Sequence, residues 1–285
     1  MRRHLESCWK SLERCLRNMY LNGERDMNTK IIMVGAAGRM GGTICRLAAA
    51  SENFDLVGMV DSKDRVSSLD RGICPVETDL AALLPQNPEA VVIDFTAPAV
   101  SLHSASVAAQ YGNALVIGTT GLSEVQKEEL QHIALTTPIF WSSNMSIGIN
   151  VLVKILPVLT QALGEEYDIE MIELHHNRKK DSPSGTALTI GECLAGARGV
   201  KLEDVRCSGR NGIIGERPKG QIGIQAVRGG DVVGVHTVYF MGPGERIEVT
   251  HHAHSRENFA RGALRAAAWM LGKKPGRLYG MADML

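Results

Sequence analysis

The sequence predicts an α/β protein with a doubly wound parallel sheet, followed by an α+β region with an open mixed sheet. Three observations lead to this prediction. Apolar runs alternate with helical segments over the first half of the chain, which is the pattern of parallel βαβ units. A glycine-rich turn joins the first apolar run to the first helix. Near the end of the chain, three apolar runs follow one another with no helix between them.

The alternating part of the chain predicts a Rossmann-type sheet. We expect strands at the apolar runs 31–34, 54–60, 90–95, 114–117 and 139–141. We expect helices from the glycine turn to about residue 51, and around 101–111 and 123–135. Strands and helices in this order build a doubly wound parallel sheet.

The character of the chain changes after Asn144. A long helix is expected at about 149–163, a strand at 167–174 and a helix that starts near Ser184. The runs 221–227, 233–240 and 245–250 are typical of an antiparallel sheet. A final helix is expected over about 256–271, from the helical spacing of Phe259, Leu264, Ala268 and Leu271.

The composition excludes several classes of protein. The 285 residues are 44% hydrophobic and 22% charged, which is ordinary for a globular chain of two modest domains. Because 31 Lys and Arg balance 31 Asp and Glu, no net charge draws the protein to nucleic acid or to an anionic membrane. The cysteines are scattered without a C-x-x-C pair, which favours reduced thiols and a cytoplasmic location. No apolar run reaches the roughly 20 residues that a membrane-spanning helix needs.

The first 26 residues have two interpretations. Apolar residues recur there at three-to-four spacing, which predicts an amphipathic helix, and the charges between them exclude a signal peptide. Alternatively, translation begins at Met27, directly before the first strand. We favour this second interpretation, because termini without evident anchoring are commonly dispensable.

A glycine-rich turn, GAAGRMG at residues 35–41, follows the first expected strand and opens a helix. Glycines let the backbone approach a pyrophosphate at a helix N-terminus, where unpaired N–H groups and the helix dipole favour anions. The spacing is G-x-x-G-x-x-G and not the common G-x-G-x-x-G, and a purely structural turn is the alternative. Asp61 ends the second strand about 20 residues later, where an acid accepts hydrogen bonds from ribose hydroxyls. Turn and acid together predict dinucleotide binding.

Two further strand ends carry small polar residues, FTAP at residues 95–98 and GTTG at 118–121. Ligands of doubly wound sheets bind at the carboxyl edge of the strands, where both segments are expected. Turn formation is the alternative for each.

The most informative segment is ELHHNRKKDSPSGTA at residues 173–187, where an apolar strand runs into a polar loop and then a helix. We expect Arg178 and Lys180 to be solvated loop charges. A metal site at His175 and His176 is disfavoured, because neither an H-E-x-x-H motif nor a cysteine partner is present.

The start of the helix in this segment is suited to an anion. Pro183 fits the first turn, with Ser182 or Ser184 as the cap. The backbone amides of residues 184–186 then point outward and can hold a carboxylate.

Taken together, these motifs resemble the 4-hydroxy-tetrahydrodipicolinate (dihydrodipicolinate) reductase family from about Lys30 to the C-terminus. The segments that carry the resemblance are GAAGRMG, DFT, GTTG, SSNMSIGIN, ELHHNRKKDSPSGTA and AVRGGDVVGVHT. The HH-x-x-K-x-D-x-P-S-G-T-A element is the most specific of them. Met145 departs from the family pattern, in which an aromatic residue can stand there, and the first 26 residues have no counterpart.

The resemblance implies a set of site residues. His175 and Lys179 match the family's catalytic residues. The expected substrate contacts are His176, Ser184, Gly185 and Thr186. The expected cofactor contacts are Gly35, Ala36, Ala37, Gly38, Arg39, Met40, Asp61, Gly118, Thr119, Thr120, Ser142, Ser143, Asn144 and Met145.

The resemblance also implies the reaction and the architecture. 4-Hydroxy-tetrahydrodipicolinate, a cyclic dicarboxylate, is reduced through dihydrodipicolinate to tetrahydrodipicolinate in lysine and diaminopimelate biosynthesis. NADH or NADPH supplies the hydride, Lys179 acts as general acid, and His175 donates or accepts a proton or orients the ring. A nucleotide domain of residues 27–146 and 256–285 and a substrate domain of residues 147–255 are expected, and the open sheet of the second assembles a homotetramer.

Two other functions fit parts of the pattern. Another Rossmann dehydrogenase of aspartate-derived substrates does not explain the HH-x-x-K loop. A non-catalytic nucleotide-sensing module need not retain His175 and Lys179.

The loop after Asp61 bears on cofactor choice. The carboxylate favours NADH because it repels a 2′-phosphate, while Lys63 and Arg65 offer cations to that phosphate. We expect both cofactors to be used, with NADH somewhat preferred.

Overall fold

The computed structural model describes residues 28–285, and they form two compact units. The first consists of the described residues up to Ser143 together with Ala263–Leu285, and the second is Asn144–Gly262. The second boundary lies inside the last long helix, not ahead of it as the sequence suggested. The expectations for residues 1–26, an amphipathic helix or a start at Met27, lie outside the described residues.

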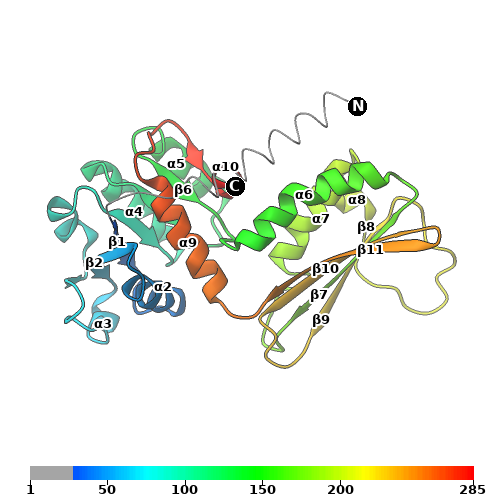
Figure 1. Cartoon of the computed structure of the whole chain (residues 1–285), viewed down its shortest axis with the longest axis horizontal. Coiled ribbons are helices and arrows are strands. Elements are labelled where there is room, and N and C mark those ends of the chain that lie inside the picture. The colour runs from blue at the N-terminus through cyan, green and yellow to red at the C-terminus, as the bar shows by residue number, and fades with distance from the viewer. Residues whose placement is uncertain (1–27) are drawn as a thin grey trace. The chain divides into compact units, whose positions relative to one another are not determined.

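The first unit is built on a seven-stranded sheet in the order β12-β6-β5-β4-β1-β2-β3 (Figure 1). All of its strand pairs are parallel. Its strands are β1 (Thr29–Val34), β2 (Phe54–Val60), β3 (Val76–Glu77), β4 (Val91–Asp94), β5 (Leu115–Ile117), β6 (Ile139–Trp141) and β12 (Leu278–Tyr279). The predicted doubly wound sheet is therefore confirmed, and the two short strands β3 and β12 extend it at its edges.

Helices cover the faces of this sheet. They are α2 (Arg39–Ala49), α3 (Lys63–Val66), α4 (Pro98–Tyr111), α5 (Glu124–Ile133) and α10 (Met281–Met284), with 3₁₀ turns η1 (Leu80–Ala82) and η2 (Leu84–Gln86). The C-terminal part of α9 (Glu257–Met270) also belongs here, since Ala263, Ala266, Ala267 and Met270 are fully buried. Residues 31–34 of β1 and 91–93 of β4 are buried on both faces, which explains why these runs are apolar without interruption.

The second unit contains a five-stranded sheet in the order β11-β10-β7-β9-β8. Its strands are β7 (Asp168–His175), β8 (Arg206–Cys207), β9 (Ile222–Arg228), β10 (Gly234–Gly242) and β11 (Glu245–Ala253). The antiparallel arrangement expected for the last three runs is wrong for the first of them. Strand β7 lies between β9 and β10, and β9 is parallel to β7. The expected mixed sheet is confirmed.

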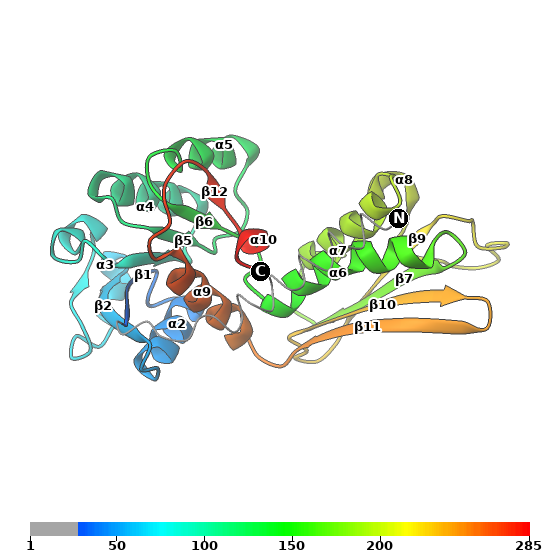
Figure 2. The same ribbon diagram turned by 45° about the horizontal axis from the view of Figure 1, so that its top comes forward.

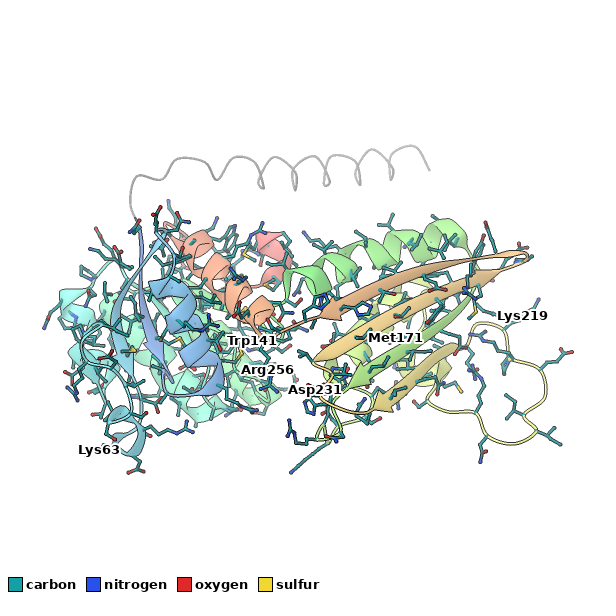
Figure 3. The ribbon with its side chains drawn as sticks, turned by 60° about the horizontal axis from the view of Figure 1, so that its bottom comes forward. Lys63, Trp141, Met171, Lys219, Asp231 and Arg256 are labelled. Atoms are coloured by element: carbon teal, nitrogen blue, oxygen red, sulfur yellow. The ribbon has the colours of Figure 1, made fainter. Side chains whose placement is uncertain are left out.

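Helices α6 (Ile147–Leu163) and α7 (Gly185–Ala197) lie side by side on one face of this sheet, with the short α8 (Leu202–Val205) beside α7 (Figures 1 and 2). Strand β7 alternates strictly in burial, so that Ile169, Met171, Glu173 and His175 face these helices. A single apolar core joins the helices to this face, and it includes Phe240, which is fully buried. The long connection between β8 and β9, which carries Lys219, extends beyond the strands (Figure 3).

Among residues 28–285, no helix is both long and apolar enough to cross a membrane.

Candidate active site

One edge of the five-stranded sheet gathers most of the predicted catalytic segment. Strands β7 and β9 run parallel and end there, at His175 and Arg228, which are paired in register. Strand β10 runs the opposite way and begins there, and it brings His236 opposite Glu173. Asp231 marks the turn between β9 and β10 at this edge (Figure 3). The topology thus collects side chains from three strands that lie far apart in the sequence.

The ring of His175 is held by a carboxylate of its own strand. Its Nδ1 lies 2.5 Å from Oε2 of Glu173, and its ring meets that of His236 edge-on at a centroid distance of 5.2 Å. Burial lowers the pKa of His175, and the hydrogen bond to Glu173 offsets this only in part. The imidazole is therefore neutral near pH 7.

Glu173 is fully buried, and an ion pair holds it. Arg228 donates to both carboxylate oxygens, at 2.8 Å from Nη1 and 2.7 Å from Nη2. Burial alone raises the pKa of a carboxyl group, but the hydrogen bonds from Arg228, His175 and the Ser184 amide outweigh it, so the pKa of Glu173 lies below its usual value. The group remains a carboxylate at neutral pH.

His236 is a residue of this site that the sequence interpretation did not single out. It is 4% exposed, and burial is the main reason that its pKa falls to about 4. Its Nε2 lies 3.1 Å from Oγ of Ser184. His236 is thus a buried, neutral side chain of the site, and it contacts the start of α7.

The start of α7 has the geometry of an anion site. Ser184 is the N-cap, and its Oγ accepts from the amide of Ala187 at 3.1 Å. Of the two predicted caps, Ser184 is correct. The placement of Pro183 in the first turn is wrong, because the helix begins at Gly185 and Pro183 precedes the cap with a cis peptide bond.

Two amides of this turn are available to a ligand. The N–H groups of Gly185 and Thr186 have no hydrogen-bond acceptor among residues 28–285, as expected for the first turn of a helix. The hydroxyl of Thr186 accepts from Nδ2 of Asn144 at 3.0 Å.

The loop before α7 contains the remaining predicted side chains. Nζ of Lys179 lies 2.9 Å from Oδ1 of Asp181, and this hydrogen bond is the first cause of the lowered pKa of Asp181. Nδ1 of His176 is buried without a hydrogen-bond partner in the described part of the chain. Arg178 and Lys180 are exposed, which confirms them as solvated loop charges.

The glycine turn of the first unit has the form that the motif predicts. Gly35 adopts φ +84°, a conformation that side chains other than glycine rarely tolerate, and a Cβ at Gly41 would lie 2.0 Å from the carbonyl oxygen of Gly35. Gly38 caps α2, and the amides of Arg39 and Met40 find no acceptor within residues 28–285. The turn therefore presents free N–H groups at a helix N-terminus, which fits a pyrophosphate.

Asp61 directly follows β2 beside this turn, and it also supports the turn. Its Oδ2 accepts from the amide of Ala37 at 2.8 Å, and its Oδ1 accepts from the amide of Ser62 at 2.8 Å. A carboxylate has about four acceptor positions, so two remain for ribose hydroxyls. The loop that follows carries Lys63 (labelled in Figure 3) and Arg65 on α3, and both are exposed.

The two other predicted strand ends meet around a buried acid. Asp94, at the end of β4, is fully buried and accepts hydrogen bonds from the hydroxyls of Thr96, Ser101 and Ser104 at 2.7–2.8 Å. The hydroxyl of Thr119, from the loop after β5, lies 2.7 Å from that of Ser101 and 3.3 Å from Oδ1 of Asp94. The sequence placed Thr119 at this edge correctly but gave no role to Asp94.

The predicted contacts at residues 142–145 fall on both sides of the boundary between the units. Ser142 and Ser143 belong to the first, and Asn144 and Met145 begin the second. Asn144 accepts from the amide of Ser146, the N-cap of α6, at 2.9 Å. The Met145 side chain is buried.

These features define a class. A doubly wound parallel sheet with a glycine turn, an acid at the end of β2 and polar loops at the carboxyl edge is a nucleotide-binding domain. A second unit with a polar edge of His, Lys and helix amides supplies groups for acid–base chemistry. The chain is thus of the two-domain, Rossmann-type oxidoreductase class.

Comparisons with known proteins give the family. Residues 29–145 match the family model described as dihydrodipicolinate reductase, N-terminus, and residues 148–285 match the model described as dihydrodipicolinate reductase, C-terminus. The chain belongs to the dihydrodipicolinate reductase family. It is similar to proteins named 4-hydroxy-tetrahydrodipicolinate reductase from Desulfovibrio desulfuricans (70% identity) and Nitratidesulfovibrio vulgaris strain DP4 (59% identity). Each alignment covers 90% of this chain and 100% of the relative.

The fold is likewise similar to that of a solved structure. A structure described as dipicolinate-bound dihydrodipicolinate reductase from Paenisporosarcina sp. TG-14 aligns with a TM-score of 0.74 at 24% identity. The alignment covers 91% of this chain and 100% of that one. Family and fold both agree with the expectation from the motifs, and they remove the two alternative functions.

Proposed function

We propose that this chain reduces 4-hydroxy-tetrahydrodipicolinate, through dihydrodipicolinate, to tetrahydrodipicolinate in lysine and diaminopimelate biosynthesis. One observation carries the proposal. His175, Lys179 and the free amides of Gly185 and Thr186 belong to a single edge of the sheet, in a chain whose whole-length relatives bear that reductase name.

The residues at the start of α7 hold the substrate's carboxylates. The free amides of Gly185 and Thr186 donate to one carboxylate, and the helix dipole adds to this attraction. Nδ1 of His176 is buried and unpaired within residues 28–285, so it donates to a ligand oxygen when it carries the hydrogen. Because the substrate ring carries two carboxylates, one can bind the amides while the other binds His176.

Lys179 is the proton donor of the site. The lowered pKa of His175 leaves its imidazole neutral at pH 7, so it is not the acid of the site. We assign that role to Lys179, whose Nζ lies 2.9 Å from Oδ1 of Asp181. Lys179 protonates the ring as charge develops next to the reduced carbon, and His175 orients the ring as a neutral group. General acid catalysis of this kind contributes about 10²–10⁴-fold in rate.

The first unit holds a nicotinamide dinucleotide, which supplies the hydride when bound. The free amides of Arg39 and Met40 receive the pyrophosphate, and Asp61 receives the ribose hydroxyls. Because Lys63 and Arg65 are exposed on the same loop, both NADH and NADPH are accepted, with NADH somewhat preferred.

The decisive experiment couples this protein to a synthase. Pyruvate and aspartate semialdehyde are supplied, and oxidation of NADH is followed with and without the protein. Lys179→Ala and His175→Ala each lower kcat by at least about 100-fold with little change in the KM for NADH. Lys180→Ala is the matched control, because Lys180 is an exposed cation of the same loop. A wild-type protein that shows no substrate-dependent oxidation refutes the proposed function.

We also infer a homotetramer in the cytoplasm. The face of the five-stranded sheet opposite α6 and α7 carries half-exposed apolar side chains, and none of the described helices covers it. These side chains include Ile172, Leu174, Val227, Val235 and Tyr239. Such a strip on a monomer marks an interface. Light scattering measures the mass of the assembly, and Val235→Glu is expected to reduce it; a monomeric wild type contradicts the inference.

The scattered cysteine spacing supports the cytoplasmic location.

A further inference from the structure

The buried carboxylate of Glu173 has more partners than charge neutralisation requires. Arg228 alone pairs both of its oxygens. The same two oxygens also face Nδ1 of His175 at 2.5 Å and the amide of Ser184 at 2.9 Å. One side chain therefore contacts the strand end that carries His175 and the cap of the helix whose amides hold the substrate.

The contact with His175 selects a tautomer. An ionised carboxylate can only accept, so the nitrogen that faces it must carry the hydrogen. Nδ1 of His175 is therefore protonated, and in the neutral ring Nε2 has the free lone pair. Without Glu173, either nitrogen could carry the hydrogen.

The charges around His175 keep this arrangement at neutral pH. The groups that face the ring are Glu173 on its own strand, Arg228 on β9, His236 on β10 and Lys179 in the following loop. Glu173 is the only anion among these four, and the cations Lys179 and Arg228 disfavour a second proton on the ring.

We propose that Glu173, clamped by Arg228, is a positioning residue that fixes the tautomer and orientation of His175 and couples them to the substrate-binding start of α7. The proposal rests on the proposed function for its kinetic readout. Glu173 itself is fully buried and acts through His175 and Ser184.

The substitution Glu173→Gln tests this directly. The glutamine amide keeps the size of the side chain but presents one donor group. An NH₂ group that faces Nδ1 makes that nitrogen the acceptor, and the hydrogen moves to Nε2. Loss of the correct tautomer in a Ser-His-Asp triad lowers kcat by about 10⁴-fold. Because Lys179 retains its own role here, we expect a smaller loss of kcat, at least about 30-fold, with the KM for NADH within about threefold.

The tautomer is read without catalysis. Nitrogen-15 NMR of the histidine rings, with His175→Gln used to assign the signal, is expected to show Nδ1 protonated in the wild type and Nε2 protonated in Glu173→Gln. A purely structural role predicts lower stability with the tautomer unchanged. If the wild type lacks reductase activity, the proposed function fails, but the NMR comparison still decides the positioning role.

A matched control and a second variant complete the test. Glu170→Gln removes a carboxylate of the same strand that is also paired with arginines but points to the other face of the sheet. At equal assembly state, its kcat and the His175 tautomer are expected to match the wild type within about threefold. Glu173→Asp keeps the charge for Arg228 and withdraws it by one methylene, and we expect kcat to fall at least about 10-fold. If Glu173→Gln does not fold, this variant carries the kinetic test. Wild-type kcat in either Glu173 variant, or an unchanged tautomer in Glu173→Gln, overturns the proposal.

Discussion

The substitution Asp94→Asn is expected to weaken both the parallel-sheet unit and its cofactor site. Asp94 is fully buried, and its charge is stabilised by hydroxyl donors, three of which lie at 2.7–2.8 Å. Unlike Glu173, Asp94 forms no ion pair with a cation among residues 28–285. The polar network alone therefore holds the carboxylate.

The magnitude follows from which bonds the amide can keep. If the asparagine oxygen takes the place of Oδ1, it still accepts from Thr96 and Ser101, while the NH₂ group faces the hydroxyl of Ser104. Hydrogen bonds to charged groups contribute about 1.5–3 kcal/mol each, whereas neutral ones contribute about 0.5–1.5 kcal/mol. Three bonds are weakened, and release of a buried charge from desolvation offsets part of this loss. We expect a net loss of about 1.5–3 kcal/mol in unfolding free energy.

The effect on the cofactor arises because Thr119 is part of the same network. Its hydroxyl bonds to Ser101 and accepts from the amide of Thr96 at 3.1 Å, so a shift at Asp94 displaces both strand-end loops. A loss of about 1–2 kcal/mol in cofactor binding corresponds to a KM for NADH that rises about 5–30-fold.

Urea unfolding followed by tryptophan fluorescence measures the stability. Trp141 and Trp269 both lie in the parallel-sheet unit, and Trp9→Phe in every sample removes the third tryptophan. Asp55→Asn is the control, because Asp55 is an exposed acid of β2 with a single side-chain bond, to Asn28, and its substitution should change the free energy by less than about 0.5 kcal/mol. If Asp94→Asn unfolds at the wild-type midpoint with an unchanged KM for NADH, the reasoning is refuted.

Three further predictions concern other parts of the molecule. Asp61→Asn should shift the ratio of kcat/KM toward NADPH, and Lys63→Ala should impair NADPH selectively; a hundredfold wild-type preference for NADPH at fixed ionic strength would show that the cations govern the pocket. His176→Ala should weaken substrate binding by about 1.5–3 kcal/mol, which appears as a higher KM for substrate with kcat nearly unchanged. A loss confined to kcat contradicts this role. The pKa of His236 is about 4 in the folded chain and near 6.5 when unfolded, so its contribution is complete above pH 6.5 and is lost as the pH falls toward 4. Between pH 7.5 and pH 5 the unfolding free energy should drop by about 2 kcal/mol more in the wild type than in His236→Gln, and equal slopes would refute the assignment.

The sequence predicted the long elements well because their hydrophobic periods were unambiguous. The runs at 54–60 and 139–141 match β2 and β6 residue for residue. The pairing of β9 was not predicted, because an apolar run does not indicate which strand lies beside it. Strand β9 pairs with β7 across an intervening helix, and that parallel pairing depends on the packing of α7 over the sheet.

The site was predicted from motifs to the extent that each motif lies on one loop. The cap at Ser184 and the glycine turn are local and were correct. Arg228 and His236 lie in the AVRGGDVVGVHT segment, but they were given no role, because only the register of β9 and β10 brings them to the end of β7. A local signal existed for Glu173, since it takes an inward position in the alternation of β7 with Ile169 and Met171.

Both units place a fully buried carboxylate at the end of a central strand, behind the loops that are expected to bind ligands. Asp94 ends β4 and joins the loops after β4 and β5, and Glu173 lies near the end of β7 and joins His175 to the start of α7. A buried charge is costly to leave unpaired, so each donor that bonds to it is held in place. Loops are otherwise the most mobile parts of a fold, whereas hydride transfer and proton donation require fixed geometry. An acid near the end of an otherwise apolar strand therefore predicts a functional loop in a sequence, because the buried carboxylate anchors the loop to the core by hydrogen bonds.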